Sequence, residues 1–336
     1  MRSPTRLLSF AVVVSSLAAC SGAQLGNSAF PGAPSRVRSA APGLTPTPVQ
    51  PASWEESLFV SDTNGANQFP VKLFRNGTWA ANGSFSNPLN APDSLWSDQK
   101  YLYVGWNAVV GAFVGVVDEY RPNYTTPIFT YSSGFAWPAV ITTQVVGNVH
   151  YVFIAGSTGN LAPATFVNEY KRDTNTVLAT CYPGAGSWIS ITGLAVAPNG
   201  SVFVAYNDVN FHGHLVEYVS GLGGCGVVPL PITFLGAVTG MARDNAGRLL
   251  VSDLRGQSVD VIDPPYTGIS GTLGSGFWYP AGISIDVNNA LAFVTDLNLK
   301  QVRVLQYPSG ALIYALGSAN GLTQPGPAVE WANYGF

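Results

Sequence analysis

The chain has 336 residues and a formal net charge of −3, and hydrophobic residues make up 47% of it against 10% charged residues. This composition supplies a large apolar core but no basic stripe, which excludes nucleic acid as an expected partner. The 37 glycines and 24 prolines favour many turns between short strands over long helices.

The first 19 residues have the organisation of an export signal. Arg2 and Arg6 form a positive start, and residues 7–17 are an apolar run too short to span a bilayer. The run ends in LAAC, residues 17–20, which resembles the lipobox of bacterial lipoproteins. The resemblance implies cleavage before Cys20 and a lipid on its thiol. The alternative is an ordinary secretory signal in which Cys20 is incidental.

Residues 20–53 are rich in Ala, Pro, Gly and Ser and show no apolar period. Such a segment cannot bury enough apolar surface to offset its ordering entropy, so we expect a disordered, extended tether. Ser21, rather than Asp, follows the cysteine, which resembles the pattern sorted to the outer membrane. The expected location is therefore the bacterial cell envelope, lipid-anchored, at the outer membrane or cell surface, with the membrane as a partner.

A recurring strand pattern dominates residues 54–336. Six segments align on one β-branched position, at Val60, Val104, Ile154, Val204, Val251 and Val294. Successive anchors are 44, 50, 50, 47 and 43 residues apart, in the range of propeller blades. A small-residue strand precedes most anchors, and an alternating strand and a fourth strand follow them. The sequence predicts an all-β fold, a six-bladed β-propeller with four-stranded antiparallel blades.

The sixth unit resembles a known repeat family. Residues 277–317 contain, in order, an aromatic residue, Pro, Gly-Ile, Asp, a strand, a second Asp, V-x-V and a final Gly. This order resembles the NHL repeat, and the units that begin at Gly240 and Gly193 follow it in part. The resemblance implies a propeller and a structural role for Asp253 and Asp296, whose side chains would brace loop backbone. It implies no particular activity, because propellers host many functions.

The first unit begins at Leu58 with its second strand and has no inner strand before it. Near the C-terminus, Pro325, Pro327 and Ala328-Val329 resemble the segments that open the other units, and residues 333–336 would follow as a turn. We therefore predict that the C-terminal strand pairs inside the first blade and closes the ring.

Lipidation of Cys20 would leave Cys181 and Cys225 as an even pair in an oxidising compartment. Cys181 is expected on the outer strand of the third blade and Cys225 just before the outer strand of the fourth. A disulfide between neighbouring blade rims is one interpretation. Two separate, partly buried thiols are the other, because the Cα distance cannot be read from a sequence.

Aromatic residues gather where loops converge at one mouth of the predicted channel. We expect Trp106 in a loop between a second and a third strand, whereas the others come just before inner strands: Trp137, Trp188, Phe277, Trp278 and Tyr279. They would either form a stacking platform for a sugar or another flat apolar ligand, or wedge between blades as core residues, which we favour. The candidates for ligand stacking are Trp106, Trp137, Trp188 and Trp278.

Carboxylates occur in the same class of loop, at Asp62, Asp208, Asp253 and Asp296. His212 and His214 lie on one side of an extended segment, a spacing that can hold a transition metal, but no third ligand is evident. A calcium site needs several converging oxygen ligands, as in related six-bladed lactonases, and no matching Glu can be placed on an inner strand. No cofactor is evident, and calcium is the alternative; the metal candidates are Asp208, His212, His214, Asp253 and Asp296.

No nucleophile motif, P-loop or dinucleotide fingerprint occurs in a convincing context. The sequence favours a monomeric, non-catalytic binding or scaffold protein of the cell envelope that holds a protein, peptide or glycan. The alternative is a divalent-metal-dependent enzyme of the lactonase or streptogramin-lyase kind on the same propeller. A third hypothesis is a purely structural surface protein. The enzyme needs carboxylate, Asn or His side chains that point into one mouth, and the scaffold does not.

Overall fold

The computed structural model describes residues 57–63, 70–75, 77–87, 90–98, 100–108, 115–121, 123–133, 135, 137–157, 165–183 and 190–331. The predicted signal, Cys20 and the tether lie outside the described residues, as do Trp188 and residues 333–336. Within the described part, the only helical element is a single 3-10 turn at Ser318–Asn320. No helix there has the length and apolar character needed to cross a membrane.

The strands form six four-stranded antiparallel sheets that follow one another around a ring. Blade 1 contains β24 (Pro325–Trp331), β1 (Ser57–Asp62), β2 (Pro70–Arg75) and β3 (Ala81–Ser86). Blade 2 contains β4 (Asn90–Ser97), β5 (Leu102–Ala108), β6 (Val116–Tyr120) and β7 (Phe129–Tyr131). Blade 3 contains β8 (Trp137–Val146), β9 (Val149–Ser157), β10 (Thr165–Lys171) and β11 (Val177–Cys181).

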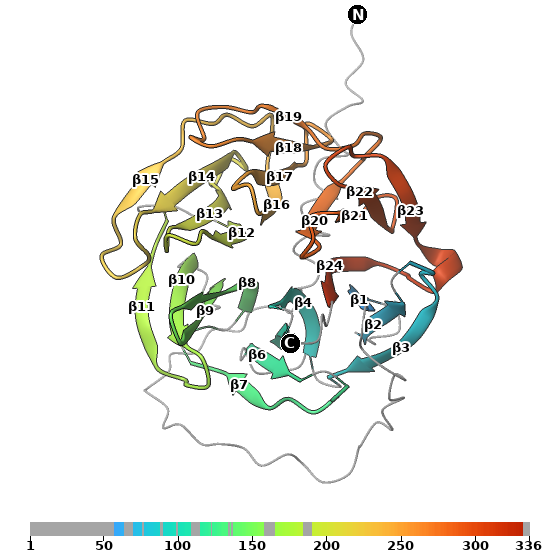
Figure 1. Cartoon of the computed structure of the whole chain (residues 1–336), viewed down its shortest axis with the longest axis horizontal. Helices are drawn as coiled ribbons and strands as arrows, with labels where there is room; N and C mark the ends of the chain where they lie inside the picture. Colours follow the sequence, from blue (N-terminus) through green and yellow to red (C-terminus); the bar gives the residue numbers. More distant parts are fainter. Residues whose placement is uncertain are drawn as a thin grey trace, which may run out of the picture. The chain divides into compact units, whose positions relative to one another are not determined.

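The second half of the ring repeats this order. Blade 4 contains β12 (Ser190–Val196), β13 (Val202–Asn207), β14 (Gly213–Tyr218) and β15 (Val227–Pro229). Blade 5 contains β16 (Val238–Arg243), β17 (Leu249–Asp253), β18 (Ser258–Ile262) and β19 (Gly271–Thr272). Blade 6 contains β20 (Pro280–Ile285), β21 (Leu291–Asp296), β22 (Gln301–Gln306) and β23 (Leu312–Leu316). Figure 1 shows the first strand of each blade nearest the centre and the fourth at the rim.

The predicted fold class is confirmed: the chain is an all-β, six-bladed β-propeller. Each of the six aligned β-branched anchors lies on the second strand of its blade and has no exposed surface. Alternation places these side chains in the apolar layers between blades, which is why the position repeats.

The ring closes as predicted. β24 pairs antiparallel with β1, so that Val329 lies opposite Phe59. The side chains of Ala328 and Val329 are 6% and 5% exposed, which places them in the core. The last strand of the chain thus completes the first blade (Figure 1).

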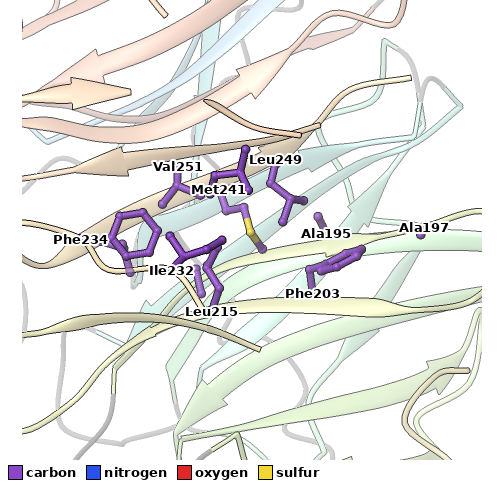
Figure 2. Packing of buried hydrophobic residues seen from close by; sticks show 12 residues of the cluster. Ala195, Ala197, Phe203, Leu215, Ile232, Phe234, Met241, Leu249 and Val251 are labelled. Carbon is purple, nitrogen blue, oxygen red and sulfur yellow. The ribbon is translucent and has the colours of Figure 1, made fainter. Parts of the chain in front are cut away.

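The cores lie between neighbouring blades. At the joint of blades 4 and 5, Leu215 of β14 and Met241 of β16 pack in one cluster, with Phe234 from the linker between these blades (Figure 2). Adjacent inner strands are also tied by hydroxyl groups. The Oγ1 of Thr239 donates to the carbonyl of Pro280 at 2.6 Å, one blade further on.

The small residues of the inner strands have a steric reason. A Cβ on Gly240 would collide with the carbonyl oxygen of Ala281 on the next inner strand. A Cβ on Gly193 would lie 2.5 Å from the Cβ of Met241. The glycine that opens several inner-strand motifs therefore allows neighbouring blades to approach closely.

Cys181 and Cys225 form a disulfide, with their Cα atoms 5.4 Å apart. The bond joins the outer strand β11 of blade 3 to the turn before β15 of blade 4. Of the two interpretations left open by the sequence, the structure has the covalent link between neighbouring blade rims.

Candidate functional site

One face of the ring carries the loops between second and third strands and the linkers between blades. In blades 1, 5 and 6 the second strand ends in an aspartate with at most 1% exposed surface: Asp62, Asp253 and Asp296. Each carboxylate accepts hydrogen bonds from backbone N–H groups of the linker that precedes its blade.

Asp253 shows the arrangement in full. Its carboxylate accepts the N–H of Leu235 in the linker at 2.8 Å. It also accepts the N–H groups of Arg255 and Gly256 in the following turn, at 3.0 and 2.9 Å. One buried side chain thus fixes both segments that form this part of the face.

The other two aspartates act in the same way. Asp296 accepts the N–H groups of Trp278 at 2.7 Å and of Leu299 at 3.0 Å. Asp62 accepts the N–H of Gln324 at 2.7 Å, and the Nζ of Lys72 donates to it at 2.6 Å. This geometry is the bracing role that the NHL resemblance implies for Asp253 and Asp296.

The clamped linkers display apolar side chains. In two of them a buried phenylalanine precedes an exposed residue: Phe234 is 8% exposed and Leu235 is 75% exposed, whereas Phe277 is 5% and Trp278 is 55% exposed. Both phenylalanines therefore pack between blades, which is the interpretation we favoured for Phe277, whereas the exposed Trp278 departs from it. The residue after each of them points away from the core.

The turn of blade 4 is also built on an aspartate. Asp208 accepts the N–H groups of Asn210 and His212 at 2.8 and 2.9 Å. Burial alone would raise the pKa of this carboxyl, but these bonds and the contact with His214 outweigh it and lower the pKa. The carboxylate is thus ionised at neutral pH. Two hydrophobic side chains of the same turn, Val209 and Phe211, are 51% and 53% exposed.

We call the exposed apolar residues of these turns and linkers the Leu235 face. Its members come from three consecutive blades and are Val209, Phe211, Leu235, Trp278 and Leu299.

The structure brings three of the predicted metal candidates together. The Oδ2 of Asp208 lies 3.3 Å from the Nε2 of His214 and 3.5 Å from the Nδ1 of His212. The ring of Tyr206 stacks on the imidazole of His214, with ring centroids 5.2 Å apart. This group can bind a polar part of a ligand through its imidazole nitrogens and carboxylate oxygens.

Asp253 and Asp296 do not join this group, since each is buried in its own blade. Among the described residues, no set of three or more His, Cys, Asp and Glu side chains is arranged to hold a metal ion.

The predicted stacking residues separate into different environments. Trp106 is not in a loop: it lies in β5, has no exposed surface and packs edge-on against Phe85. A residue enclosed in the core cannot stack on a ligand, so the loop position and the stacking alternative are wrong for Trp106, whereas the favoured core interpretation is confirmed for it. Trp137 is the first residue of β8 and is half-buried. Trp188 lies outside the described residues, and Trp278 is exposed as stacking requires.

Two features of this face escaped the sequence reasoning. Asp93 lies on the inner strand β4, where its carboxylate accepts the Nδ2 of Asn107 at 2.7 Å. Burial raises the pKa of Asp93, and the bond from Asn107 opposes that rise. Leu235 is not aromatic and therefore does not belong to the set of stacking candidates that the sequence indicates. An alignment of Phe234-Leu235 with Phe277-Trp278 would have indicated it.

The sequence matches no protein-family model, and no curated protein matches it. Among solved structures, a chain from the crystal structure of a nidogen/laminin complex is similar, with a TM-score of 0.61 and 14% identity. The similarity covers 82% of this chain and 98% of that chain. A protein of unknown function from Bacteroides caccae has a TM-score of 0.56 and 10% identity, over 82% and 99% of the two chains.

At these identities the likeness extends to the fold alone. The chain is a six-bladed β-propeller, and this fold is consistent with a binding or scaffold role.

Proposed function

We propose that this protein is a non-catalytic binding protein of the bacterial cell envelope, anchored through a lipid on Cys20, and that it binds a partner with the Leu235 face. One observation carries the proposal: apolar side chains are exposed on loops whose backbone N–H groups donate to buried aspartates. Leu235, the most exposed of them at 75%, sits on a backbone held by Asp253.

Fixed loops lower the entropy lost when a partner binds, because fewer backbone conformations have to be given up. Exposed apolar residues gathered on one part of a surface are a common mark of an interaction site. The similar chain of the nidogen/laminin complex belongs to a protein–protein assembly. This supports a binding role for a propeller of this shape.

A photo-crosslinking amino acid at position 235 in the full chain, in its native host, tests the binding proposal. We expect a discrete crosslinked partner that is lost when Trp278→Asp is added. Leu178, which is 52% exposed on β11, supplies the matched control position. Equal crosslinking from both positions, or an adduct that survives Trp278→Asp, would overturn the proposal.

The anchor has its own test. Metabolic labelling with an acyl-chain probe should label the wild-type protein and leave Cys20→Ser unlabelled. Because Cys181 and Cys225 are bonded to each other, they supply no free thiol for the label. Unlabelled wild-type protein would show that the segment is an ordinary secretory signal.

A metal-dependent lactonase or streptogramin-lyase-like enzyme remains the second candidate, and Asp93 with Asn107 favours it, since both are oxygen-bearing side chains of blade 2. Against it, the carboxylates of Asp253 and Asp296 are engaged by backbone N–H groups and are not offered to an ion. Metal analysis of the purified protein, with thermal shifts in calcium and in chelator, separates the two. A tightly bound ion and a shift would favour the enzyme.

A further inference from the structure

We propose that the occupant of the Leu235 face is a protein segment in which apolar side chains lie next to carboxylates. This rests on the proposed function and specifies the chemistry of its partner.

The apolar residues of the face are interleaved with cations. Arg255 and Lys300 are exposed and lie in the turns that follow Asp253 and Asp296. The side chain of Arg255 lies directly over the linker, because a Cβ on Gly236 would be 2.5 Å from its Cγ. Arg255 therefore packs against Gly236, the residue that follows Leu235 in the linker.

The carboxylates near these loops are either buried and hydrogen-bonded to backbone N–H groups or paired with histidine side chains. Asp62, Asp253 and Asp296 are buried and accept backbone N–H groups. Asp208 lies between two imidazoles. A partner therefore meets cations and apolar groups on this face, although the whole chain has a net charge of −3. Charge complementarity then calls for an anionic partner.

The apolar members decide between kinds of anionic partner. Leu235, Val209 and Leu299 are aliphatic, and Leu235 is the most exposed of the set. Sugars stack on aromatic rings, whereas aliphatic side chains offer no flat face for stacking and are buried favourably against apolar side chains of a protein. A protein segment is thus favoured over an acidic glycan.

Panning a random 12-residue peptide library on phage against the full chain with Cys20→Ser tests the proposal. We expect enriched peptides to combine Trp, Leu or Phe with Asp or Glu. Synthetic versions should bind at least tenfold more weakly to Trp278→Ala and to Arg255→Gln/Lys300→Gln. The matched controls Leu178→Ala and Arg121→Gln/Lys171→Gln change exposed residues elsewhere and should bind as the wild type does.

The outcomes separate this inference from the proposed function. Peptides that lack acidic residues but depend on Trp278 would overturn the acidic chemistry and leave the binding face intact. Peptides that bind all variants equally would overturn both. Vesicles of phosphatidylglycerol provide a further arm: binding that is lost in Leu235→Ser/Trp278→Ser would assign the face to an anionic membrane and overturn the protein partner.

Discussion

Blades 5, 6 and 1 hold their loops in a different way from blades 2 and 3. In the first group the residue two positions after the anchor is the buried aspartate that clamps the linker. In blades 2 and 3 the same position is occupied by Trp106 and Gly156, which cannot accept backbone N–H groups with a side chain.

Blades 2 and 3 place their polar groups on the outer strands instead. In blade 2, Asp118 accepts the Oγ1 of Thr130 at 2.6 Å and the hydroxyl of Tyr120 at 3.3 Å. Blade 3 repeats the network with an amide: Asn168 accepts the Oγ1 of Thr180 at 2.7 Å, and its Nδ2 donates to the hydroxyl of Tyr170 at 3.0 Å.

The joint between these two blades is also charged. The fully buried Glu119 accepts the Nε of Arg172 at 2.9 Å, and the guanidinium of Arg172 lies 3.5 Å from the ring centroid of Tyr101. The comparison teaches that every blade needs its loops and its joints fixed, whereas the chemistry that fixes them varies. Blades 5, 6 and 1 use a buried aspartate to hold the preceding linker, and blade 4 uses Asp208 to hold its own turn on this side of the ring.

Removal of the closing strand should have the largest effect. Deletion of residues 325–336 takes the inner strand from blade 1 and leaves one edge of β1 unpaired, with the core contacts of Val329 lost. We expect a loss comparable with the whole free energy of unfolding of a domain, about 5–15 kcal/mol. Thermal unfolding followed by circular dichroism measures it. Deletion of residues 332–336 keeps β24 and is the control, and equal melting temperatures would contradict the closure.

The disulfide comes next, because it is the covalent joint between blades 3 and 4. Cys181 and Cys225 are 44 residues apart, and a loop of that size stabilises the folded state by about 4 kcal/mol through chain entropy. Cys181→Ser/Cys225→Ser should lower the denaturant midpoint accordingly. A reductant should lower the midpoint of the wild type and leave the double variant unchanged. A wild-type midpoint insensitive to the reductant would argue against the bond.

Loss of one aspartate clamp should cost less. Asp253→Ala leaves the N–H groups of Leu235, Arg255 and Gly256 without their acceptor, which we expect to destabilise the fold by about 3 kcal/mol. Urea unfolding measures the change. Asp263→Ala removes an exposed carboxylate of the same blade and should have little effect. Equal urea midpoints for the two variants would show that the hydrogen bonds to Asp253 do not contribute to the free energy of unfolding.

The six units could be predicted because one physical demand repeats. Each blade needs a β-branched residue in the layer between sheets, and Val60 and Val294 satisfy it at the two ends of the pattern. The closing strand was predictable for the same reason, since a missing inner strand in the first unit must be supplied from elsewhere.

The binding face was less predictable because exposure is decided by contacts across blades. Trp106 was expected in a loop, yet β5 continues through it to Ala108 and the indole enters the core. The pairing of Cys181 with Cys225 stayed open because it depends on how two rims meet in space. Leu235 is one hydrophobic residue among many in the sequence. Its position outside the core depends on the hydrogen bond from its backbone N–H to Asp253, which a sequence does not show.

The smallest expected effect tests the matched networks of blades 2 and 3. Burial raises the pKa of Asp118 above its usual value of 3.8, and the bonds from Thr130 and Tyr120 oppose that rise. The folded state therefore binds this proton more tightly than the unfolded state does. The stability contributed by Asp118 is full at low pH and is lost as the pH rises from 3.8 through the raised pKa.

Asp118→Asn removes the titrating group. The amide can keep the hydrogen bonds to Thr130 and Tyr120, as Asn168 keeps the equivalent bonds in blade 3. We expect the variant to be more stable than the wild type by about 1 kcal/mol at neutral pH, with the difference vanishing in acid. Asn168→Asp is the reciprocal change and should introduce the same pH dependence into blade 3, with the loss at neutral pH. Urea unfolding across the pH range measures both variants. A difference that stays constant with pH would show that Asp118 does not titrate in the way its burial dictates.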